Sequence, residues 1–227
     1  MGLFDNLTLT VGLLIGLTVL ISLRAFNDPQ LRARLLFHPA SVKNRGEWDR
    51  FITHGFIHGD GGHLFFNMWG LLIFGPAAEE IFTTIIFQSE LVGRLAFLAF
   101  YLISIAAASL PTYFRHQDHM GYSALGASGA VAAIMWPFIM YDPWNWFIFP
   151  PLPAFIIGIG YIVYSSYMDK RGNSRIGHNA HLWGAVFGLV VYVSILLLLG
   201  DSTYEYGYAN PLDVFIERIQ QPRGPSF

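Results

Sequence analysis

Three polar clusters interrupt otherwise apolar stretches of the chain, and their residue types suit acyl transfer. Ser128 lies in GASGA, His181 lies in HNAHLWGAVFG, and His63 and Asn67 stand four residues apart in HLFFN. A serine hydroxyl becomes a nucleophile when a neighbouring histidine takes its proton. Two donors one helical turn apart can hydrogen-bond a carbonyl oxygen as it gains negative charge. These residues therefore predict a nucleophile, a base and an oxyanion hole.

The composition predicts that these residues belong to a membrane protein. Of the 227 residues, 54% are hydrophobic and 12% are charged, whereas an average soluble domain carries about 25% charged residues. The chain has no cysteine, which excludes disulfides, thiolate catalysis and zinc–sulfur sites. A net charge of −2 does not point to nucleic acid as a partner. The beginning, MGLFDNLT, lacks the marks of a signal peptide, so we expect a retained first membrane helix.

Six segments are apolar over about the 20 residues that a spanning helix needs. We expect an all-α, polytopic membrane protein with a six-helix bundle over 1–200. A C-terminal tail over 201–227 would hold a short amphipathic stretch and a disordered end. The connection 24–62 mixes basic, aromatic and apolar residues, which predicts a structured loop at the membrane surface. The predicted spans are 7–23, 63–87, 95–114, one within 121–141, 153–168 and 182–199.

The fourth span is short, and its length predicts the depth of Ser128. A helix from Ser128 to Tyr141 would be about 21 Å long, against a hydrocarbon core of about 30 Å. The helix would therefore begin about 9 Å below the nearer surface. Its free N–H groups favour negative charge, and non-helical backbone at that depth requires a watery cavity. With six spans, the clusters around His63, Ser128 and His181 share one membrane face.

Glycines allow the helices that carry the serine and the histidine to pack closely. His181, Gly184 and Gly188 share one stripe of the sixth span, and Gly126 and Gly129 flank the serine. Small residues at such positions let two helices approach each other. We therefore expect the histidine to reach the serine hydroxyl.

No acid completes a triad with these two residues. Asp142 would lie about 21 Å from Ser128 along the helix, and Asp169 and Asp201 have no motif around them. The sequence predicts a Ser–His dyad, in which His181 acts first as base and then as acid towards the leaving amine.

Four motifs, in order along the chain, resemble those of the rhomboid family of intramembrane serine proteases. The family's HxxxN occurs at 63–67, its GxSG at 126–129 and its AHxxGxxxG at 180–188. The stretch RFITHGFIHGDGGHLFFN, which starts at Arg50, is similar to the family's approach to the second helix. The resemblance covers about 50–188.

The resemblance assigns a role to each of these residues. It implies that Ser128 is the nucleophile and His181 the base, and that His63, Asn67 and the Ser128 N–H form the oxyanion hole. Gly126 would belong to the same substrate-binding region. Residues implied to give structural support are Arg50, His58, Glu79, Gly129, Gly184 and Gly188.

The resemblance also implies the reaction. Rhomboids cleave transmembrane segments of other membrane proteins, usually near their outer ends at small residues. They use no metal and no soluble cofactor. A partly submerged loop follows their first helix, and their fifth helix with the loop after it forms a substrate gate.

One position departs from the family pattern. The residue four positions after the nucleophile is often aromatic in the family and packs on the catalytic histidine, but here it is Ala132. We expect His178, Trp183 or Tyr164 to orient His181 in its place.

The orientation in the membrane is predicted differently by charge and by resemblance. Ten of the thirteen Lys and Arg residues lie in the connections of the predicted catalytic face, which the positive-inside rule would put in the cytoplasm. The family implies a bacterial-type cell (inner) membrane with the active site facing outside. We expect the family orientation, because the long first connection is folded and charge counting is less reliable there.

Each of these residues has a simpler explanation when taken alone. A serine or asparagine can join helices by packing or hydrogen bonding, and His54, His58 and His63 have a spacing that permits metal ligation. No carboxylate or cysteine completes such a metal site, and only the co-location of the residues favours a protease. The alternatives are a catalytically inactive rhomboid-like protein that binds membrane clients, and a small channel or transporter.

Overall fold

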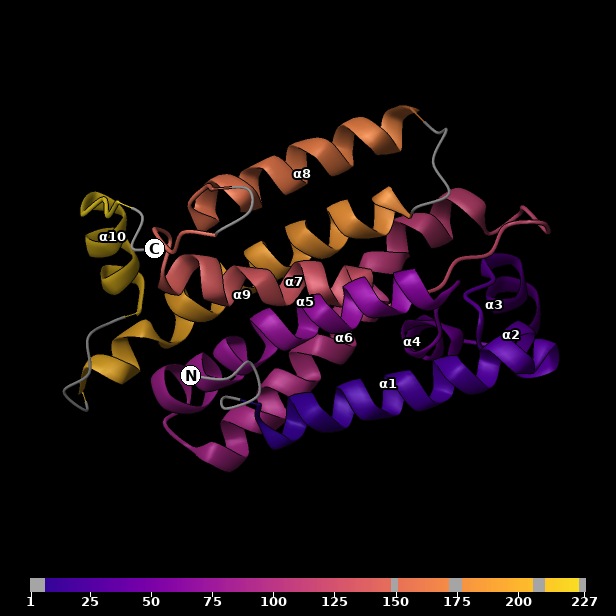
Figure 1. Cartoon of the computed structure of the whole chain (residues 1–227), viewed down its shortest axis with the longest axis horizontal. Helices are drawn as coiled ribbons and strands as arrows, with labels where there is room; N and C mark the ends of the chain where they lie inside the picture. The colour runs from indigo at the N-terminus through magenta and orange to yellow at the C-terminus, as the bar shows by residue number, and fades with distance from the viewer. Residues whose placement is uncertain (1–6, 148–150, 172–176, 206–210, 225–227) are drawn as a thin grey trace.

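The computed structural model describes residues 7–147, 151–171, 177–205 and 211–224, and these residues form a bundle of helices without a strand (Figure 1). The helices are α1 (Leu9–Asn27), α2 (Pro29–Leu35), α3 (Pro39–Arg45), α4 (Arg50–Thr53), the 3₁₀ turn η1 (His54–Phe56), α5 (Gly61–Glu80), the π-helical segment η2 (Ile81–Ile86), α6 (Glu90–His116), α7 (Ser128–Tyr141), α8 (Ala154–Arg171), α9 (His178–Glu205) and α10 (Pro211–Gln220).

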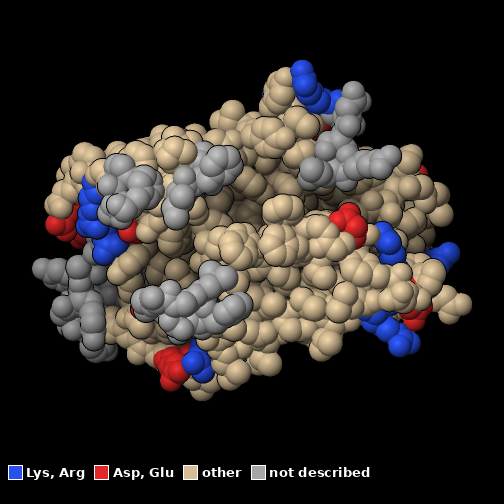
Figure 2. Space-filling view, viewed as in Figure 1, with Lys and Arg blue, Asp and Glu red and all other residues tan. Residues whose placement is uncertain are grey.

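The long helices have the length and composition of membrane spans. Four stretches within the described residues are apolar and long enough to cross a bilayer, namely α1, α5 with η2, α6, and the part of α9 up to Leu198. The other two helices of the core are α7, an apolar helix of 14 residues, and α8, of 18 residues. In Figure 2 the charged side chains gather towards the two ends of the long axis and leave an uncharged band between them. The prediction of an all-α, polytopic membrane bundle is confirmed.

The helix bounds shift by a few residues from those predicted. The fourth span begins at Ser128, as predicted, and the preceding residues are not helical. The sixth begins at His178, one turn earlier than predicted, so His181 lies in the first turn of α9 rather than before it. The tail contains α10, which corresponds to the predicted amphipathic stretch.

The residues after α10 are described as far as 224, and they dock onto the bundle. The indole Nε1 of Trp146 donates to the Arg223 carbonyl over 2.7 Å, and that of Trp144 donates to the Ile219 carbonyl over 3.2 Å. Two indoles of the connection between α7 and α8 thus bind the backbone of α10 and of the residues that follow it, and the disordered end stays a prediction. Residues 225–227 lie outside the described residues.

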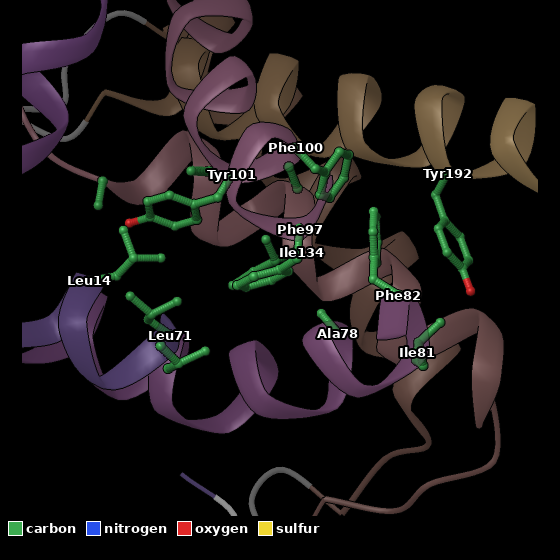
Figure 3. Close-up of a cluster of buried hydrophobic side chains, with 14 of the residues drawn as sticks. Leu14, Leu71, Ala78, Ile81, Phe82, Phe97, Phe100, Tyr101, Ile134 and Tyr192 are labelled. Carbon is green, nitrogen blue, oxygen red and sulfur yellow. The ribbon is translucent and has the colours of Figure 1, made fainter. Parts of the chain in front are cut away.

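Helix α7 forms the centre of the bundle. It packs against α5, α6, α8 and α9, and ten of its 14 residues are buried. A helix that is apolar on all sides is stable only when it is enclosed in this way. Figure 3 shows the surrounding core, to which α1, α5, η2, α6, α7 and α9 all contribute. The labelled side chains are Leu14, Leu71, Ala78, Ile81, Phe82, Phe97, Phe100, Tyr101, Ile134 and Tyr192.

The connection from α1 to α5 is structured, as predicted. It contains α2, α3, α4 and η1, and Arg50 joins these pieces from a buried position. The Arg50 guanidinium donates to the carbonyls of Ala33 and Leu36 over 2.9 and 2.6 Å, and its Nε lies 2.5 Å from the Glu47 carboxylate. Planar guanidinium donors suit such multiple acceptors, so Arg50 fixes the folded shape of the connection.

Glu79 performs a similar task at the opposite end of the bundle. Its carboxylate is buried, and it accepts hydrogen bonds from the hydroxyls of Thr8 and Thr10 over 2.5 and 2.9 Å. Arg94 Nε lies 3.3 Å away on α6. Because a buried carboxylate is stable only when it is paired and hydrogen-bonded, Glu79 ties α1 and α6 to the end of α5.

Helices α7 and α9 touch through glycines. A Cβ on Gly184 would overlap the Gly129 carbonyl, and one on Gly188 would overlap the backbone of Ala133. The predicted close approach of the fourth and sixth spans is therefore present.

We expect Gly188→Ala to weaken the bundle, because the added methyl must push α7 and α9 apart. The expected loss in free energy of unfolding is about 1–3 kcal/mol, as for other overpacked cores. The measurement is the thermal unfolding midpoint in detergent. Gly160→Ala is the matched control, because a Cβ at Gly160 meets no atom within 4 Å. Equal midpoints for the two variants would contradict the close packing.

Candidate active site

Ser128 is the first residue of α7, and no side chain caps this helix start. The first N–H groups of a helix have no partner within the helix and carry partial positive charge. Gly126, two residues earlier, has a φ of 114°, a conformation that residues with a Cβ rarely adopt. The turn at Gly126 therefore directs the chain into α7 and leaves the helix start open to an anion.

The chain before Ser128 is held by the connection between α1 and α5. Phe37 and Ala124 exchange two backbone hydrogen bonds of 2.9 Å each. The Gly126 N–H donates to the His54 carbonyl over 2.9 Å, and the Ala127 N–H donates to His58 Nε2 over 3.4 Å. These bonds pair the N–H groups of three of the last four residues before α7.

His54 and His58 are buried and are held as neutral rings. His58 Nε2 accepts from Ala127, so its Nδ1 carries the proton towards the Ser22 hydroxyl, 3.0 Å away. His54 Nε2 lies 2.9 Å from the Ser109 hydroxyl. Burial lowers the pKa of His54 from 6.5 to about 4. Burial, and to a lesser degree the neighbouring His63, lower the pKa of His58 from 6.5 to about 3.

His63 lies directly against the turn before the serine. A Cβ on Gly126 would meet His63 Cε1 at 2.7 Å and Nε2 at 2.9 Å. The Gly59 N–H donates weakly to His63 Nδ1 over 3.4 Å, which leaves the proton on Nε2. The Nε2–H group therefore faces the backbone two residues before Ser128, and Gly126 must be a glycine to admit the ring.

Asn67 lies one turn further along α5 and is buried. Its amide donates back to the carbonyl of His63 over 2.9 Å. One amide hydrogen is thus used within the helix, and only the second remains for an oxyanion. The predicted place of Asn67 in the oxyanion hole therefore depends on this second hydrogen.

The backbone next to His181 lies close to the backbone next to Ser128. A Cβ on Gly129, the residue after Ser128, would lie 3.3 Å from the carbonyl oxygen of Ala180, the residue before His181. Among the described residues, no hydrogen bond joins the Ser128 hydroxyl to the His181 ring. Such bonds are often long in unliganded sites and tighten around the substrate.

Two aromatic rings hold the ring of His181. Tyr161 of α8 stacks on it, with centroids 5.8 Å apart and planes at 21°, and His178 meets it edge-on at 5.7 Å. Of the three residues expected to orient His181, only His178 touches its ring. Tyr164 packs on His178 instead, and Tyr161 was missed because no motif marks it.

The acidic residues near the site serve other partners. Asp169 of α8 accepts from the Arg115 guanidinium over 3.1 Å and from the Asn179 amide over 3.1 Å. Asp142 lies at the far end of α7, where it caps the helix. The side chain of Asp201 lies outside the described residues.

The metal-binding alternative finds no support in the described residues. No group of three His, Asp or Glu side chains there is arranged to hold an ion. His54 and His58 are engaged by serines from α6 and α1, and His63 faces the turn at Gly126.

Comparison with known proteins identifies the family. Residues 45–198 match the family model described as the Rhomboid domain. RHOMBOID-like protein 12, mitochondrial, from Arabidopsis thaliana is 33% identical over 187 residues, which are 78% of this chain and 55% of that relative. This chain thus spans little more than half the length of that relative.

Two further relatives are similar over most of their own lengths. Rhomboid protease GlpG from Haemophilus influenzae is 24% identical over 156 residues, which cover 69% of this chain and 74% of the relative. Putative rhomboid protease YdcA from Bacillus subtilis is 27% identical over 191 residues, which cover 83% and 87%. With the matching family model, these similarities establish that the chain belongs to the rhomboid family.

We expect acid to destabilise the loop before Ser128. The folded-state pKa values of His58 and His54, about 3 and about 4, lie below the ordinary 6.5. The unfolded chain therefore binds more protons between these values and 6.5, and the free energy of unfolding falls as the pH falls through that window. The measurement is the thermal unfolding midpoint in detergent across this range.

The variant His58→Gln isolates the contribution of His58. At neutral pH it should lose about 1–3 kcal/mol of stability, because the flexible amide does not reproduce the ring that joins the Ser22 hydroxyl to the Ala127 N–H, but its midpoint should depend less on pH. His119→Gln is the control, because His119 is exposed and lies outside this network. A pH dependence in His58→Gln equal to that of the wild type would contradict the role of His58.

Proposed function

We propose that this rhomboid-family protein is an intramembrane serine endopeptidase that cleaves transmembrane segments of other membrane proteins. Ser128 attacks the scissile carbonyl while His181 takes the hydroxyl proton. His181 then gives this proton to the leaving amine as the C–N bond breaks, and water hydrolyses the resulting acyl-enzyme. The observation that supports this most directly is the placement of Ser128 at an uncapped helix start, directly after the turn at Gly126 against which His63 lies. The protease names of two relatives agree with it.

In this proposal the oxyanion is held by three kinds of donor. They are the Ser128 N–H at the positive end of α7, the His63 Nε2–H, and the second amide hydrogen of Asn67. Each donor is fixed before the substrate arrives, and such preorganised donors stabilise negative charge most effectively in a water-poor site. Gly126 keeps the space between His63 and the backbone open.

Water and substrate must both reach this site. The polar chain 117–127 descends to Ser128, and we assign the water-filled access to this side, since unpaired backbone at such depth requires it. We assign substrate entry to the side of α8, which lies at the edge of the bundle and packs on α7 and α9 (Figure 1).

A fluorophosphonate probe tests the proposal, because it reacts only with an activated serine. The wild type should be phosphonylated at Ser128, and both Ser128→Ala and His181→Ala should lose the label. His63→Ala should label about 10²–10³ times more slowly, as for other oxyanion-hole donors. The measurement is the rate of labelling, with the modified peptide identified by mass spectrometry.

A folded wild type that is not labelled by the probe would contradict the protease assignment and favour a client-binding rhomboid-like protein. Ser123→Cys is the matched control. Ser123 is exposed and lies in the polar chain before Ser128, and its loss should leave the labelling rate unchanged.

We also propose that the catalytic face lies outside a bacterial-type cell membrane, as the family resemblance implies. Because the chain has no cysteine, single cysteines can report the orientation. With a membrane-impermeant maleimide on spheroplasts, Ser123→Cys should react at once, whereas Glu90→Cys, at the other end of the bundle, should react only after permeabilisation. The reverse pattern would show that the positive-inside rule is obeyed instead.

A further inference from the structure

Helix α8 supplies the more nearly parallel of the two ring contacts of His181. The Tyr161 ring lies nearly parallel to it, with centroids 5.8 Å apart and planes at 21°. His178, three residues earlier on the same helix as His181, meets the ring only edge-on. A stacked partner restricts rotation of an imidazole about its χ2 angle, whereas an edge contact restricts it less.

Helix α7 does not provide an aromatic partner one turn after the serine. At that position Ala132 is buried and presents only a methyl group. A base that must point its nitrogen at a hydroxyl needs an orientation fixed within about 10–20°. Of the two rings that contact His181, only Tyr161 lies nearly parallel to it, and Tyr161 comes from another helix.

The same face of α8 touches the first turn of α9 at two more places. Tyr164 packs on His178, with centroids 5.6 Å apart. Asp169 accepts from the Asn179 amide over 3.1 Å and also binds Arg115. The position of Tyr161 over His181 is thus set by how α8 lies along α9.

We propose that Tyr161 is the positioning residue of His181, so that the orientation of the catalytic base depends on the placement of α8. The inference rests on the proposed protease function. Tyr161 does not touch the substrate in this account and acts only through the imidazole. Any displacement of α8 from α9 removes the stacked ring and leaves His181 free to turn.

Substitutions at position 161 distinguish the effect of the aromatic ring from the effect of side-chain size. Tyr161→Phe keeps the stacked ring and should retain the maximal rate of fluorophosphonate inactivation within about twofold. Tyr161→Leu removes the ring and should lower that rate by about 10- to 100-fold, the usual cost of a misplaced catalytic group. The probe concentration for half-maximal rate should be unchanged, since probe binding is not affected.

Tyr167→Leu is the matched control on the same helix. Tyr167 is exposed and stacks with Arg171 rather than with a histidine of α9. It should inactivate like the wild type. Thermal unfolding midpoints of all three variants show whether each remains folded.

A second readout does not depend on activity. In protein labelled with ¹³C at histidine Cε1, the His181 resonance is assigned by its loss in His181→Gln. It should move in Tyr161→Leu, because the ring current disappears, and should stay nearly in place in Tyr161→Phe and Tyr167→Leu. An unmoved resonance with an unchanged inactivation rate in Tyr161→Leu would overturn the inference. If the wild type fails to label, the protease function fails, and the resonance still decides whether Tyr161 holds the ring.

Discussion

The backbone between α6 and α7 imposes the constraint on which the site depends. Non-helical backbone inside a membrane must find a partner for each N–H and C=O group, because lipid offers none. Here the partners of the last residues before α7 come from one segment, the connection between α1 and α5. It pairs with Ala124 through Phe37, accepts from Gly126 through the His54 carbonyl, and accepts from Ala127 through His58. Without these bonds the backbone groups just before Ser128 would lack partners, and the start of α7 at Ser128 would be unfavourable.

The short central helix has consequences for its neighbours. No side chain caps α7, so its first turn keeps free N–H groups. Helix α9 can bring His181 to this turn only if the two backbones nearly touch. Glycines at 129, 184 and 188 permit that approach. The side chain one turn after Ser128 is only the methyl group of Ala132, and the ring that lies nearly parallel to His181 is instead Tyr161 of α8. The close packing of α7 on α9 and the proposed chemistry thus depend on the same few small residues.

The sequence predicted the parts of the site that depend on local pattern. The polar run before GASGA, followed by uninterrupted apolar residues, identified Ser128 as a helix start, and glycine spacing identified the α7–α9 contact. It did not predict the partners of the loop before Ser128. The Gly126 N–H binds the backbone carbonyl of His54, and every residue type offers such a carbonyl. Tyr161 and the return of the Asn67 amide to His63 were also missed. Both depend on how helices rotate against each other, which spacing along the chain does not reveal.

Proteolysis of a transmembrane segment in a bilayer is the most direct test of the account. The purified chain would be reconstituted in liposomes with a single-span reporter that has small residues near one end of its membrane segment. The account predicts cleavage near that end, with fragments identified by mass spectrometry and absent from liposomes that contain the Ser128→Ala variant. An intact reporter beside folded wild-type protein, for a series of reporter segments, would contradict it, and so would equal cleavage by Ser128→Ala.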